Sequence, residues 1–162
     1  MKKDVLISIK GVYAAVEEEA DVVELFTTGE YYEQDGNYYI SYDETEATGF
    51  EGSRTIVKVE KEDKVTVERS GQAVTQLIVQ RGVRHQCRYD VGYGDMIIGV
   101  NGGSICSTLN ADGGKISFKY SLDVNSLLAS ENEMYIHIQE AAGKQDFGMV
   151  LDKNTISAEA IF

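Results

Sequence analysis

Apolar and polar side chains alternate along most of this chain with a period of two. That period is typical of a β-strand with one buried and one solvated face, whereas an amphipathic helix repeats about every 3.6 residues. The pattern therefore predicts an all-β protein. The positions expected to face inward are Val5, Ile7 and Ile9; Thr55, Val57 and Val59; Val65 and Val67; Leu77 and Val79; Met96, Ile98 and Val100; Ile116, Phe118, Tyr120, Leu122 and Val124; and Met134, Ile136 and Ile138.

Turn signals separate these segments at short intervals. The chain has 16 Gly and no Pro, so Gly, Asn and Asp must supply the turn conformations. Short connections join antiparallel neighbours, and closing the sheet on itself removes exposed edges. We therefore predict an antiparallel meander closed into a barrel of about eight to ten strands. The turn signals are Asp35-Gly36, Glu62-Asp63, Arg81-Gly82, Gly102-Gly103 and Asp112-Gly113-Gly114.

Two connections allow more local predictions. A three-residue loop at 80–82, with its Gly in the left-handed position, would pair Leu77 with His85 and Thr75 with Cys87. That register keeps the charged neighbours of His85 and Cys87 on the solvent side. Residues 125–131 (NSLLASE) are predicted to form a helical turn between the last two strands.

The charge balance limits the classes of partner. Fifteen Lys and Arg against 27 Asp and Glu give a formal charge of −12. Nucleic acids and anionic lipid surfaces bind cationic patches, so neither nucleic acid nor membrane is expected as a partner. The chain lacks a signal-like or membrane-spanning apolar run, and its two thiols, Cys87 and Cys106, are ordinary in a reducing compartment. We therefore predict a cytoplasmic protein.

Motifs that carry a catalytic mechanism are missing from the sequence. It contains no P-loop, dinucleotide fingerprint, His-Glu-x-x-His pair, calcium loop or nucleophile elbow. His85 and Cys87 share one strand face, where they would form a metal-ligand pair, a thiol with its base, or a packed His beside a small thiol. The packed interpretation is favoured. We expect no catalytic residue, metal or cofactor, and an enzyme using His85 with Cys87 or Arg69 is the last of our hypotheses.

Five polar residues lie where the pattern predicts an interior or an aromatic hairpin. They are Arg69, Thr75, His85, Tyr89 and Tyr42, and they are our candidate ligand-binding residues. Polar groups inside a barrel must bond to one another, to water or to a ligand. In one interpretation Arg69 bends to the barrel mouth and bridges a carboxylate, while Tyr89 and His85 complete a closed internal network. In the other, they orient the polar head of a ligand.

Several segments resemble a known family. They are GEYYEQDGNYYISYDETEATGFEG, ERSG at 68–71, the stretch 89–94 followed by IIGV, LNADGGKISFKYSLDVN and SENEMYIHI. In their order and spacing they resemble the YwiB-like family, bacterial domains of unknown function with a calycin-like, lipocalin-type β-barrel. The resemblance covers roughly residues 3–140 and implies that fold, but no functional residue. The family often has Thr-Pro before its Tyr-Gly, where this chain has Val91 and Gly92.

Two functional hypotheses follow from this reading. The first is a non-enzymatic barrel at 1–140 whose interior binds a small, largely apolar or carboxylate-bearing ligand. The second is a module for protein–protein interaction or homodimer assembly with no ligand. In that case the apolar residues of a C-terminal extension at 141–162, packed on the barrel or partly disordered, would form the contact.

Overall fold

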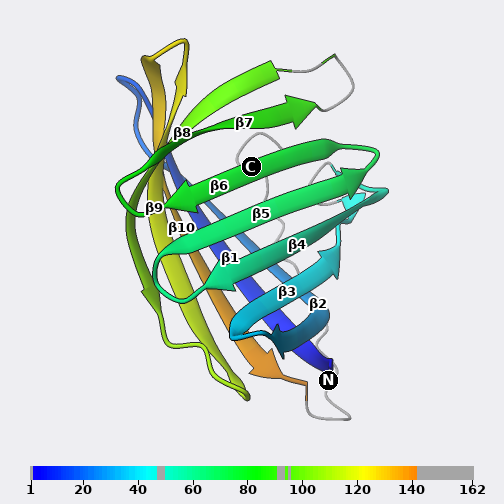
Figure 1. Ribbon diagram of the computed structural model, residues 1–162. Helices are drawn as coiled ribbons and strands as arrows, with labels where there is room; N and C mark the ends of the chain where they lie inside the picture. The colour runs from blue at the N-terminus through cyan, green and yellow to red at the C-terminus, as the bar shows by residue number, and fades with distance from the viewer. Residues whose placement is uncertain (1, 47–49, 91–93, 95, 142–162) are drawn as a thin grey trace.

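A computed structural model describes residues 2–46, 50–90, 94 and 96–141. The described residues form ten strands, shown in Figure 1. They are β1 (Lys3–Ala15), β2 (Asp21–Gln34), β3 (Asn37–Asp43), β4 (Ser53–Glu60), β5 (Lys64–Gly71), β6 (Val74–Gln80), β7 (Arg84–Asp90), β8 (Met96–Ser107), β9 (Gly113–Val124) and β10 (Leu127–Glu140).

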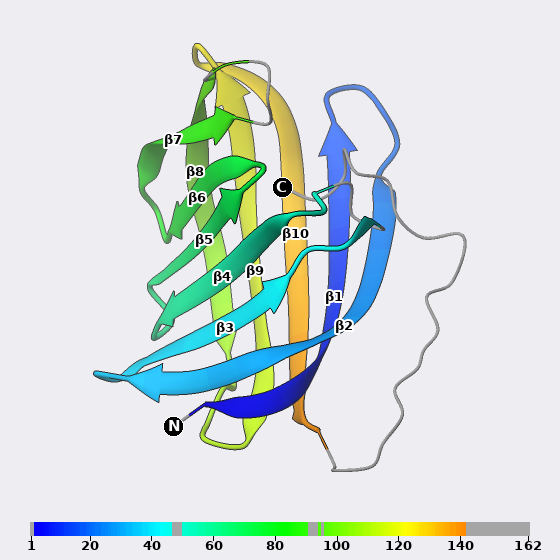
Figure 2. The same ribbon diagram turned by 90° about the vertical axis from the view of Figure 1, so that its right-hand side faces the viewer.

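Every strand pairs with its sequence neighbour in antiparallel orientation, and β1 pairs with β10 to close the barrel. The long β1 and β10 lie side by side in Figure 2. This confirms the predicted all-β fold and the closed meander. The C-terminal extension predicted at 141–162 lies outside the described residues, apart from Ala141.

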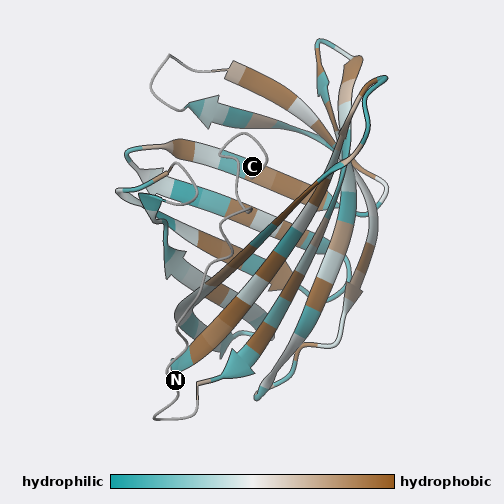
Figure 3. Ribbon diagram, turned by 180° about the vertical axis from the view of Figure 1, so that it is seen from behind, coloured by the Kyte–Doolittle hydropathy of each residue, from teal (hydrophilic) through white to brown (hydrophobic). Residues whose placement is uncertain are grey.

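The interior follows the predicted alternation, and hydrophobic and hydrophilic segments alternate along the strands in Figure 3. Apolar side chains from all ten strands, with Cys87 from β7, form one buried cluster, which includes Ile7, Val59, Leu77 and Phe118. Met96 and Val124 depart from the pattern, because each lies at the end of its strand and is exposed. Burial of this apolar surface is the main favourable term in folding.

The predicted turn at Gly102-Gly103 is wrong, because β8 continues through both residues as a bulge. The Gly102 N–H donates to the Val83 carbonyl and the Gly82 N–H donates to the Gly102 carbonyl, both at 3.1 Å. A Cβ on Gly102 would lie 2.0 Å from the Gln80 carbonyl oxygen. Glycine is needed here for the close approach of two backbones, not to reverse the chain.

The predicted register of the β6–β7 hairpin is also wrong. Thr75 pairs with Tyr89 instead of Cys87, and a Gln80–Val83 bridge closes a two-residue turn. The bulge in β8 forms hydrogen bonds with this turn. The sequence of the hairpin alone does not reveal them. A shift of two residues preserves the side of each residue, so Cys87 still faces the core.

The helical turn predicted at 125–131 is a tight β-turn. Asn125 and Ser126 have positive φ angles of 53° and 70°. Two consecutive left-handed residues form the turn that matches the twist of paired strands, and Asn tolerates that conformation well. Leu127 then begins β10 directly, with a bulge between Leu128 and Ser130.

Candidate ligand site at one end of the barrel

The candidate site is a polar cluster inside one end of the apolar barrel. Strand termini and the loop between β3 and β4 meet there, and a second small hydrophobic cluster of Val23, Phe50 and Ala73, with Tyr13 packed against it, lies at this end. The loop is held by backbone bonds: Glu44 N–H donates to the Ser53 carbonyl at 2.9 Å and Ser53 N–H donates to the Phe50 carbonyl at 3.0 Å. These bonds fix the start of the Glu44 side chain.

An ion pair lies at the centre of this cluster. The Arg69 guanidinium donates to Glu44 Oε2 from Nε at 3.3 Å and from Nη2 at 3.2 Å, and both side chains are 0% exposed. Arg69 Nη1 donates to Thr75 Oγ1 at 3.1 Å, and the Thr55 hydroxyl donates to Glu44 Oε2. Desolvation of two charges is tolerated only with such additional bonds. The two charges therefore neutralise each other inside the barrel.

The Phe50 ring covers the guanidinium. Its centroid lies 4.0 Å from Arg69 Cζ, and the Phe50 side chain is itself buried. A cation over an aromatic face is attracted by the ring quadrupole, most strongly when water is excluded. Phe50 therefore both stabilises the cation and keeps solvent from it.

Three tyrosines surround the ion pair and remain neutral phenols. Burial raises the pKa of Tyr42, and the nearby Glu44 carboxylate raises it further; Tyr42 also shares a hydrogen bond with Thr55. Burial likewise raises the pKa of Tyr89 and of Tyr120, although the Arg69 cation opposes both shifts. A neutral phenol keeps its proton, so each can donate a hydrogen bond at physiological pH.

Two polar atoms of this cluster are buried without a hydrogen-bond partner among the described residues. They are Tyr120 Oη and Asn132 Oδ1. Tyr120 and Asn132 are directly paired across β9 and β10, and both are buried. The Asn132 amide nitrogen already donates to Ser130 Oγ at 3.1 Å. Buried polar atoms are nearly always satisfied, so these two are the atoms that a water or a ligand would engage.

The structure brings four of the five sequence-predicted residues together. Arg69 and Thr75 bond directly, Tyr42 joins them through Thr55 and Glu44, and Tyr89 is half-buried within electrostatic range of Arg69. His85 belongs elsewhere: its Nε2 lies 2.8 Å from Gln80 Oε1, beside the β6–β7 turn. Cys87 accepts a hydrogen bond from the Ile78 N–H at 3.4 Å, and burial raises the pKa of its thiol. His85 and Cys87 therefore make separate contacts with β6.

A family model described as a domain of unknown function, DUF1934, matches residues 7–136. The chain belongs to the DUF1934 family. An uncharacterized β-barrel protein of Bacillus subtilis, YwiB, is 32% identical over 126 residues, which are 76% of this chain and 86% of YwiB. The crystal structure of YwiB superposes with a TM-score of 0.75 at 26% identity, covering 87% of this chain and 94% of that one.

These comparisons confirm the family that the sequence segments resemble and the β-barrel fold that it implies. DUF1934 and YwiB carry no assigned activity in their descriptions, so they transfer no functional residue.

Sequence reasoning missed Glu44 and did not select Tyr120 or Asn132 as site residues. Glu44 lies in a loop after β3, where a period-two pattern assigns no side. Tyr120 was predicted to face inward, and Asn132 has the same parity as Met134 and Ile136 in β10. A polar residue continuing an apolar series was therefore the available signal for Asn132.

No group of three or more His, Cys, Asp or Glu side chains that could hold a metal ion occurs in the described part of the chain. No helix among those residues has the length and apolar character needed to cross a bilayer.

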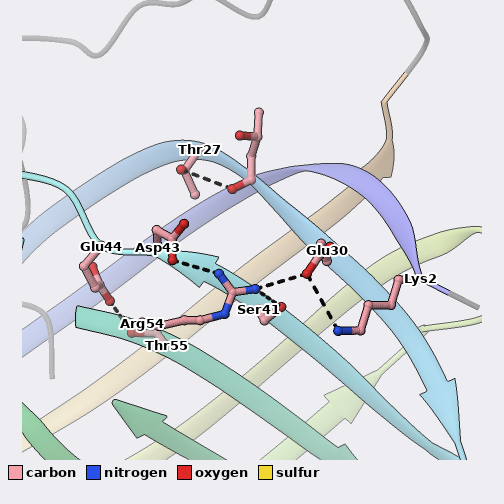
Figure 4. A network of polar contacts seen from close by, with 9 residues as sticks. Lys2, Thr27, Glu30, Ser41, Asp43, Glu44, Arg54 and Thr55 are labelled. Atoms are coloured by element: carbon pink, nitrogen blue, oxygen red, sulfur yellow. Dashed lines mark hydrogen bonds and ion pairs between the residues drawn. The ribbon is translucent and has the colours of Figure 1, made fainter. Parts of the chain in front are cut away.

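A second polar network is centred on Arg54, and Figure 4 shows it beside the bond between Thr55 and Glu44 of the cluster. Arg54 donates to Asp43 Oδ1 at 2.8 Å, to Ser41 Oγ at 3.0 Å and to Glu30 Oε1 at 3.1 Å. It ties β4 to β2 and β3, where β2 leaves its pairing with β3. Its charges are matched and partly solvated, so this network is a structural clamp.

Proposed function

We propose that this protein binds one small, largely apolar molecule inside its barrel, with the polar part of that molecule at the Arg69 end. The single observation that carries the proposal is the pair of buried atoms, Tyr120 Oη and Asn132 Oδ1, which lack partners among the described residues. Ligand sites are typically apolar with a few convergent polar groups, as this end of the barrel is. We propose that the barrel resembles in this respect the barrels of lipocalins, which hold one small ligand.

Barrel width supports the proposal. The diameter of a barrel grows roughly linearly with strand number, and about eight strands already suffice to hold one small ligand. The ten described strands therefore enclose a wider interior. Much of its wall is Val and Ile, as at Val57, Val59 and Val65. These side chains extend less far toward the barrel axis than Phe or Tyr.

The seam between β6 and β7 supports an entry path. The two strands pair at Val74–Asp90 and Thr75–Tyr89. Between these pairs and the β6–β7 turn, the Ile78 N–H donates to the Cys87 sulfur and not to a backbone carbonyl of β7. A groove of about 500 Å³ crosses the outer face of this region, and Arg69, Thr75 and Arg88 are among its lining residues. Few backbone bonds need to break for this seam to open.

The binding function is tested with protein purified from its own cells and with a neutral hydrophobic dye. We expect the native mass to exceed the chain mass by a bound compound that organic solvent removes, and the extracted protein to bind Nile red. Val67→Phe, inside the barrel, should weaken dye binding, whereas Val22→Phe, exposed on β2 and outside the groove at the seam, should not. A native mass equal to that of the chain, together with no dye binding, would remove the proposal.

A second candidate function is self-association, and a patch of exposed apolar residues favours it. The patch comprises Met96, Ile97, Val124, Leu127 and Leu128, near the β9–β10 turn, and Leu127 is 75% exposed. Exposed apolar side chains gathered near one turn are typical of interaction sites. Light scattering should show a dimer that Leu127→Ser with Leu128→Ser converts to a monomer; a wild-type monomer at high concentration contradicts this function.

A further inference from the structure

We infer that the polar head of the bound molecule is an uncharged hydrogen-bonding group, such as an alcohol or a primary amide, and not a carboxylate. This inference rests on the proposed binding function and specifies its ligand class. It departs from the expectation that Arg69 orients a carboxylate. The charge of the cluster and the chemistry of its two unpartnered atoms lead to it independently.

The charge of the cluster excludes an anionic head. Arg69 and Glu44 already form a buried pair in which both Nε and Nη2 of the guanidinium donate to the carboxylate, while Nη1 donates to Thr75. Their charges cancel, and the surrounding tyrosines are neutral because burial raises the pKa of each. A carboxylate would bring a second anion beside Glu44 with no further cation from this cluster.

The two unpartnered atoms define the head more closely. Asn132 Oδ1 accepts only, so it needs a donor, while Tyr120 Oη can donate to an acceptor. A hydroxyl or a primary amide carries both a donor and an acceptor. A carboxylate offers acceptors alone and would leave Asn132 Oδ1 buried without a partner, which is costly. When the carboxylic acid is protonated, its O–H group can donate to Asn132 Oδ1.

Three molecules with the same saturated chain separate these cases: 1-decanol, decanamide and decanoate. Binding is measured by displacement of Nile red from the extracted protein. At pH 8 we expect the alcohol and the amide to bind roughly tenfold or more tightly than decanoate, the factor that one lost hydrogen bond of about 1.4 kcal/mol represents. The difference in affinity between decanoate and the two neutral molecules should narrow as the pH falls toward the pKa of decanoic acid.

Two variants test the named atoms. Asn132→Leu should weaken decanol binding about tenfold while leaving decanoate binding at pH 8 nearly unchanged, because decanoate has no donor for Asn132 Oδ1. Tyr120→Phe removes a donor that both head groups use, so it should weaken the binding of both molecules. Tyr135→Phe is the matched control, since it removes a phenol hydroxyl on the solvent side of β10. Circular dichroism confirms that each variant is folded.

The outcomes distinguish the two proposals. Equal or tighter binding of decanoate at pH 8, or undiminished decanol affinity in both variants, overturns the neutral-head inference and leaves the binding function standing. If Nile red and all three molecules fail to bind the wild-type protein, the binding function itself is wrong, and this inference falls with it.

Discussion

The Arg69–Glu44 ion pair has no contact with solvent, so its two members depend on each other. Removing one member of a buried pair leaves an uncompensated charge, at a cost of about 3–5 kcal/mol. We expect Glu44→Gln to lower the free energy of unfolding by that amount in urea titrations. Glu46→Gln, on an exposed residue of the same loop, should have no comparable effect. The double variant Glu44→Leu with Arg69→Met should recover much of the loss, because no buried charge remains.

The Asp123 carboxyl group should make the stability of the fold depend on pH in the acidic range. A bidentate hydrogen bond from Arg84, at 3.0 and 2.7 Å, lowers the pKa of the Asp123 carboxyl, and bonds from Ser126 and Asn101 act in the same direction. Because the folded pKa lies below the unfolded value of about 3.9, this group stabilises the fold above that pH. The contribution is lost as the pH falls through the folded pKa.

Thermal unfolding at several pH values checks this prediction. Asp123→Asn should have a lower Tm than the wild type at pH 7, and the difference should shrink below about pH 4. The control is Asp21→Asn, on an exposed side chain at the start of β2, whose effect should be small at both pH values. A difference for Asp123→Asn that stayed constant down to pH 2 would contradict the assignment.

At the scale of elements, the bulge in β8 determines how three strands meet. Gly102 lies against the backbone of Gln80, whereas a Cβ on the adjacent Gly103 would lie 3.1 Å from its nearest neighbour, the Lys119 carbonyl oxygen. Gly102→Ala should therefore destabilise the fold by about 1–3 kcal/mol, as overpacking of well-packed sites does. Gly103→Ala should cost clearly less in the same urea titrations. Equal effects would show that the close approach is unimportant.

At the scale of the whole molecule, net charge opposes self-association. Each chain carries a formal charge of −12, so two copies repel each other at low ionic strength. Salt screens this repulsion, because the Debye length falls from about 30 Å at 0.01 M to about 8 Å at 0.15 M. If the apolar patch around Leu127 forms a dimer, sedimentation should show tighter association at the higher salt concentration. Association that weakened with salt would instead indicate an ion-paired contact.

The fold could be predicted from sequence because strand periodicity is a local property. In a meander of neighbouring antiparallel strands, that local property leaves few possible arrangements. Ile116, Phe118 and Tyr120 face inward as predicted, and Arg69 and Thr75 do so because they continue such series. The partner of Arg69 could not be predicted, because Glu44 lies in a loop 25 residues away and is positioned by a backbone hydrogen bond to Ser53. The predicted β6–β7 register was wrong for a similar reason, because the bulge in β8, distant in sequence, forms hydrogen bonds with the β6–β7 turn.

The amino-acid sequence by itself determined the all-β class, the order of the antiparallel strands and the side of the wall on which most residues lie. These follow from alternation and turn chemistry, which act between near neighbours. Only the tertiary structure decided that Glu44 neutralises Arg69, that Tyr120 and Asn132 are left with unpartnered atoms, and that His85 lies apart from them. Those facts depend on which loops and strand ends meet when the barrel closes, and such long-range contacts leave no period in the sequence.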